Sequence, residues 1–118
     1  MEPTLEKIIE LARKLGETIR VHERYLALRR AETNVMGDVS ARKVQDDLEL
    51  QLTKMHNLEA EQKPIEVADK RELARLQEVA RSAPALQELL KAQADYFEMM
   101  NHVNNAILGA LAPDEEAS

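Results

Sequence analysis

The chain has 118 residues, a formal net charge of −6 and no cysteine. Its length fits a single domain, and the absence of cysteine excludes disulfides, thiolate metal sites and cysteine nucleophiles. With only three glycines and four prolines, 44% hydrophobic, 32% charged and 3% aromatic residues, the composition is typical of an α-helical protein with an aliphatic core.

The first apolar stripe predicts a helix that begins at about Thr4, where Pro3 and Thr4 suit a helix start. Its spacing is i, i+3, i+4 and i+7, and its members are Leu5, Ile8, Ile9, Ala12 and Leu15. Gly16 suits an end or a bend of this helix. The helical pattern then continues to about Thr33, as either one bent helix or two.

Asn34–Asp38 is the clearest break in the pattern. Either Asp38 or Ser40 suits the N-cap of the next helix, because a short oxygen-bearing side chain can accept from the free N–H groups of the first turn. We predict that this helix runs to about Gln62.

Lys63–Pro64 is the second break, since the residue before proline is driven out of the α region and Pro64 can open a helix at its first position. Arg81–Pro84 is the third break, with Ser82 as the expected cap and Pro84 in the first turn of the last helix. That helix extends to about Leu111.

The last helix carries an apolar face that is too wide for one neighbour. Its apolar residues fill heptad positions a, d, e and g, whereas a two-stranded seam needs only a and d. We therefore expect a helical bundle that also self-associates. The residues expected at the oligomer interface are Leu90, Gln93, Phe97, Met99, Met100, Asn104 and Leu111. Gln93 and Asn104 are polar and either fix the register or meet water at the edge of the stripe.

No window alternates with period two, so a sheet is not expected. The predicted fold is all-α: a helical bundle or hairpin of four to five helices with a long C-terminal amphipathic helix. We expect one domain over residues 4–111, with a short helical region followed by two long antiparallel arms joined through the fourth helix. Residues 112–118 are expected to form a disordered acidic tail.

No motif for catalysis is present. His22, His56 and His102 each lack a glutamate three residues earlier, which a carboxylate-bridged metal bundle would supply. There is no Gly-x-Ser-x-Gly and no glycine-rich phosphate loop. We therefore predict no catalytic residue, no cofactor, no metal and no enzymatic activity.

Charge is distributed unevenly: residues 1–30 carry +2 and the remainder carries −8. A basic edge on the second helical segment consists of Arg20, Arg24, Arg29 and Arg30. One interpretation is that it docks an acidic protein or an RNA backbone. The other is that it is a solvated face whose charge is balanced by nearby glutamates. The overall acidity and the lack of interleaved aromatics argue against nucleic acid.

The helix order and the last helix resemble a known family. The resemblance lies mainly in Ser82–Ala94, where a small residue and a proline precede an apolar run, and in Met99–Ile107, which ends in Val-Asn-x-x-Ile. It also includes Leu5–Ala12 and Tyr25. They are similar to the YlbF/YmcA family of small helical bacterial regulators. The resemblance implies an all-α, oligomeric, non-enzymatic protein that acts with partner proteins. Some members bind an Fe–S cluster through cysteines, which this chain lacks.

We therefore expect a homo-oligomeric regulator or adaptor that works through contacts with itself and with an unidentified protein. The alternative is an RNA-associated protein that uses the basic edge. No apolar run approaches the ~18 residues of a membrane span, and Met1–Lys7 has no apolar core of a signal peptide. A bacterial-type cytoplasmic location, without membrane insertion, is expected.

Overall fold

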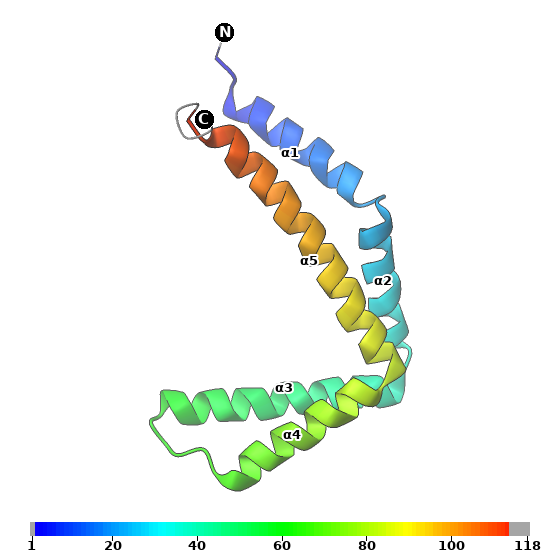
Figure 1. Ribbon diagram of the computed structural model, residues 1–118, viewed down its shortest axis with the longest axis vertical. Coiled ribbons are helices and arrows are strands. Elements are labelled where there is room, and N and C mark those ends of the chain that lie inside the picture. Colours follow the sequence, from blue (N-terminus) through cyan, green and yellow to red (C-terminus); the bar gives the residue numbers. More distant parts are fainter. Residues whose placement is uncertain (1, 114–118) are drawn as a thin grey trace. The chain divides into compact units, whose positions relative to one another are not determined.

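A computed structural model describes residues 2–113 of the chain. It contains five helices, which are α1 (Leu5–Ile19), α2 (Glu23–Met36), α3 (Val39–Ala60), α4 (Val67–Ser82) and α5 (Pro84–Leu111) (Figure 1). No strand occurs among these residues. The predicted all-α fold with a long C-terminal helix is confirmed, and the N-terminal region consists of two helices. Most of the predicted acidic tail, from residue 114 onward, lies outside the described residues.

Two helix starts were predicted correctly from side-chain caps. The backbone N–H of Lys7 donates to Thr4 Oγ1 at 3.1 Å at the start of α1. The N–H of Ala41 donates to Asp38 Oδ1 at 3.0 Å at the start of α3. Each cap satisfies one of the N–H groups that the first turn leaves without a helical acceptor. Pro84 is the first residue of α5, as expected.

Two other predicted starts were wrong. Pro64 does not open α4, because Glu66 is the N-cap and forms a reciprocal capping box with Asp69. Ser82 does not cap α5, because it is the last residue of α4 and its hydroxyl donates to the Glu78 carbonyl at 3.1 Å. The hydroxyl is therefore already bound within its own helix.

The described residues form two compact units, and each is considered by itself. The terminal unit comprises residues 2–30 and 92–113, and the central unit comprises residues 31–91. Helices α2 and α5 each contribute to both units. In the central unit α3 and α4 form an antiparallel hairpin (Figure 1). The predicted layout made the third and the last helices the antiparallel arms, so the partner of α3 was predicted wrongly.

A small core stabilises the central unit. Its buried apolar residues are Ala31, Val35, Ala41, Leu76, Leu86 and Leu89. The buried Asp69 lies in the hairpin and pairs with Lys54 Nζ at 2.7 Å, while Gln51 Nε2 donates to the Asp69 carbonyl at 2.9 Å. The hydrogen bond from Lys54 holds the pKa of Asp69 below its ordinary value, against the opposing effect of burial. Gln51, which interrupts the apolar stripe of α3, thus joins α3 to α4.

Candidate interaction surface

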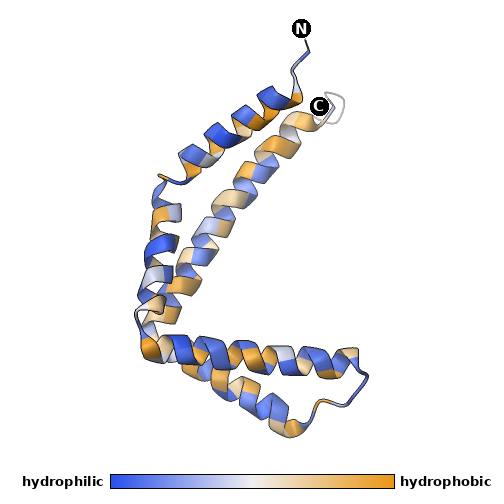
Figure 2. Cartoon of the chain, turned by 180° about the vertical axis from the view of Figure 1, so that it is seen from behind, coloured by the Kyte–Doolittle hydropathy of each residue, from blue (hydrophilic) through white to orange (hydrophobic). Residues whose placement is uncertain are grey.

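The terminal unit has almost no core of its own. Ala92 is the only buried residue in its described part, and α1 contributes no buried residue at all. Folding must offset about 1–2 kcal/mol of backbone entropy per residue, which burial of apolar surface normally supplies. The unit therefore exposes the apolar surface that would ordinarily form its core. Figure 2 shows where hydrophobic residues recur along α1 and α5.

The first exposed strip is on α5 and is called the α5 seam. Its members follow one another at alternating steps of three and four residues and are Gln93, Phe97, Met100, Asn104, Ile107 and Leu111. This is the a/d spacing of a helix that packs against another helix. Phe97 is 60% exposed and Leu111 is 73% exposed. The α5 seam includes five of the seven residues predicted at the oligomer interface, which are Gln93, Phe97, Met100, Asn104 and Leu111.

Met99 and Leu90 complete the predicted interface set. Met99 and Met100 are both half-buried. Met99 lines a shallow hollow with Arg24 of α2 and lies outside the spacing of the seam, whereas Met100 has that spacing. Leu90 lies one step before Gln93 on the same helix, in the central unit, and is 58% exposed. Of the adjacent pair, Met100 is therefore the one on the seam.

The second exposed strip is on α1 and is called the α1 seam. It shows the same alternating spacing, and its members are Leu5, Ile8, Ala12, Leu15 and Ile19. Leu5 is 71% exposed. On the polar side of α1, Glu10 pairs with both Lys7 and Lys14. The sequence predicted this helix but did not assign its stripe to an interface, although the spacing is readable in the sequence alone.

Contacts between α2 and α5 hold the terminal unit together. The rings of Tyr25 and Tyr96 lie 6.0 Å apart between centroids in a tilted arrangement, a favourable geometry for aromatic pairs. Arg24 Nη1 donates to the Asp95 carbonyl at 3.0 Å and lies 3.8 Å from Glu98 Oε1. Asp95 and Glu98 lie on the side of α5 away from its seam, whereas Tyr96 lies beside the seam residue Phe97, with 6.1 Å between the ring centroids.

The basic edge predicted on α2 is only partly available for docking. The guanidinium of Arg24 is engaged with α5, as described, and Arg29 also has an interaction partner. Arg20 and Arg30 are exposed. The structure therefore does not bring the four arginines together as one open cationic surface.

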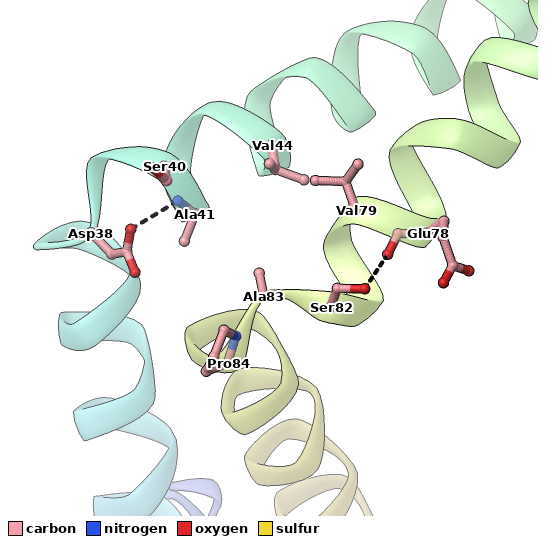
Figure 3. Close-up of a pocket in the computed structure, with 9 residues that line it drawn as sticks. All are labelled: Asp38, Ser40, Ala41, Val44, Glu78, Val79, Ser82, Ala83 and Pro84. Atoms are coloured by element: carbon pink, nitrogen blue, oxygen red, sulfur yellow. Dashed lines mark hydrogen bonds between the residues drawn. The ribbon is translucent and has the colours of Figure 1, made fainter.

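Two hollows are too open and too poor in chemical groups to form an active site. One, in the central unit, has a volume of about 440 Å³ and lies between the start of α3 and the end of α4, with Val44 and Val79 facing each other (Figure 3). Asp38 and Ser82 at its margin already make helix-terminal hydrogen bonds. The other hollow, in the terminal unit, contains His22 beside Met99.

Metal clusters and membrane spans are absent from the described residues as well. No group of three or more His, Asp or Glu side chains within residues 2–113 is arranged to hold a metal ion. In the same residues, no helix is both long enough and apolar enough to cross a bilayer. The features that stand out are the two seams, which makes the candidate site a surface for packing against other helices.

Fold and surface together define an all-α protein with exposed apolar faces on its first and last helices. Residues 8–112 match the model of the family described as "Control of competence regulator ComK, YlbF/YmcA". The chain belongs to this YlbF/YmcA family, which is a family of regulators, and the predicted resemblance is confirmed.

A solved structure described as "Protein of Unknown Function (DUF964) from Bacillus stearothermophilus" has the same fold. The TM-score is 0.73 at 19% sequence identity, and the match covers 88% of this chain and 91% of that one. None of the curated proteins compared with the chain matches it.

Proposed function

We propose that the chain is a non-enzymatic cytoplasmic regulator that acts through protein–protein contacts as a homo-oligomer. Membership of a regulator family supports the regulatory role. The observation that supports the assembly is the terminal unit, in whose described part Ala92 alone is buried while most residues of both seams are exposed. A contiguous apolar surface on a helical protein marks a site of interaction with another protein.

The α5 seam, continued by Leu90, is the proposed oligomer interface. Phe97 is the largest exposed side chain on the seam, so it suits an anchor residue. Gln93 and Asn104 interrupt the apolar residues at seam positions. Polar residues at such positions favour one register or oligomer state at some cost in stability, and we assign them that role.

The unidentified protein partner is proposed to use a different part of the surface. Arg20 and Arg30 are exposed and offer cationic groups to an acidic partner. A solvent-exposed ion pair contributes at most about 1 kcal/mol, so this edge would orient a partner that binds mainly through apolar contacts. An RNA-binding role is not favoured, because Arg24 is bound to α5.

A charge placed on the seam tests the assembly. Phe97→Lys would bury an ammonium group in the interface, which is strongly unfavourable without a partner charge. We therefore expect the dissociation constant of the oligomer to rise by at least about 100-fold. Asn105→Lys adds the same charge to an exposed position of α5 off the seam and serves as the control. Molar mass is measured by light scattering after gel filtration. Equal masses for both variants and the parent would remove the seam from the interface.

A further inference from the structure

The two seams of the terminal unit match in length as well as in spacing. The α1 seam extends over the 15 residues of α1, and the α5 seam from Phe97 to Leu111 covers the same length of helix. At 1.5 Å per residue each stretch is about 22 Å long. Helices with the same three-and-four spacing pack knobs into holes along their whole common length.

Most of each seam is left uncovered within one copy of the chain, although Ile19, Gln93 and Met100 are half-buried. Every large apolar residue of α1 from Leu5 to Leu15 is more than a third exposed, and so are the large apolar residues at the end of α5. The α5 of the same copy belongs to the same unit and still leaves α1 without a single buried residue. The exposed part of each seam is therefore available to an occupant from outside the copy.

The exposed apolar area is large enough for a stable dimer. The large apolar residues concerned are Leu5, Ile8, Ile9, Leu11, Leu15, Phe97, Ile107, Leu108 and Leu111. From their exposed fractions they leave on the order of 1,000 Å² accessible, against about 800 Å² that each partner buries in a standard interface. One second copy is sufficient to cover this surface.

The end of α5 can meet a second copy without burying a charge. Asn101–Leu111 contains no Lys, Arg, Asp or Glu. Burial of this stretch against a second copy therefore carries no cost for taking a charged group out of water.

We propose that α1 of one copy packs, seam to seam, against the Phe97–Leu111 part of α5 of a second copy. Two copies then build one four-helix bundle from two α1 helices and two α5 ends, whose core is made of the four seams. The inference rests on the proposed homo-oligomer and names what covers each seam. It makes α1 an exchanged element, and the terminal unit gains its core only in the dimer.

The lack of native cysteine allows a direct test. An Ile8→Cys variant and a second variant, cysteine-substituted at Phe97, Leu108 or Leu111, carry tags of different mass. They are refolded together and treated with a short bismaleimide. A product of mixed mass can form only between two copies. Glu10→Cys, on the polar side of α1, replaces Ile8→Cys as the matched control.

We expect Ile8→Cys to give about tenfold more mixed product than Glu10→Cys with at least one of the three α5 positions, because cross-linking requires close approach of the two side chains. Equal yields from both faces of α1 would overturn the pairing. The pairing would also be overturned if the double variant Ile8→Cys/Leu108→Cys formed cross-links only within one chain. If the unlinked protein has a dimer mass in either case, the proposed oligomer survives and only the pairing falls. A monomer mass removes both.

Discussion

Replacing Leu76 by alanine removes a side chain that is only 3% exposed in the α3–α4 hairpin. Loss of three buried carbons costs about 2.4 kcal/mol at ~0.8 kcal/mol each. The unfilled space raises this to about 3 kcal/mol, in the range observed for buried leucines. Such a loss is a large share of the ~5–15 kcal/mol that stabilises an ordinary domain.

The assay is urea unfolding followed by far-UV circular dichroism. Protein concentration is held constant, because association contributes to apparent stability. Leu50→Ala is the matched control: Leu50 is 69% exposed on α3, and we expect its loss to cost less than about 0.5 kcal/mol. A Leu76→Ala effect below ~1 kcal/mol, or one equal to that of Leu50→Ala, would refute the placement of Leu76 in the core.

Two further predictions concern polar residues. Lys54 lowers the pKa of Asp69 in the folded protein, so this pair contributes stability above the unfolded pKa of about 4 and loses it as the pH falls through the lower folded value. In Asp69→Asn the thermal midpoint should be lower at neutral pH and should change less than that of the parent on acidification; parallel pH profiles would contradict this. Asn104→Leu should strengthen association but broaden the distribution of oligomer masses, and an unchanged single mass would rule out a register role for Asn104.

Local chemistry explains which elements could be predicted from the sequence. Thr4 and Asp38 were identified as caps because their acceptor oxygens precede apolar stripes of helical spacing. The start of α4 was missed because Pro64 is a strong signal and the Glu66-x-x-Asp69 capping box is a weaker one, since serine or threonine is its usual first residue. Both signals are local, and in the structure Glu66 and Asp69 mark the start of α4, two residues after the proline.

Long-range partners could not be predicted in the same way. The stripe of α3 fits α4 and the last helix equally well, because any apolar helical face suits another of similar length. The choice of α4 depends in part on Lys54 and Gln51 reaching Asp69, which spacing alone does not reveal. Likewise, the sequence predicted that α5 is covered from two sides but made no such prediction for α1. The spacing of the α1 seam is the same whether the neighbouring helix belongs to the same chain or to another chain.

Sedimentation equilibrium of the unaltered protein over a range of concentrations tests the central claim, that the terminal unit is completed by another copy. One chain has a mass of 13.4 kDa. We predict a mass of at least twice that value, falling only on strong dilution. A mass of 13.4 kDa at every concentration would contradict self-association and leave the two seams without the proposed occupant.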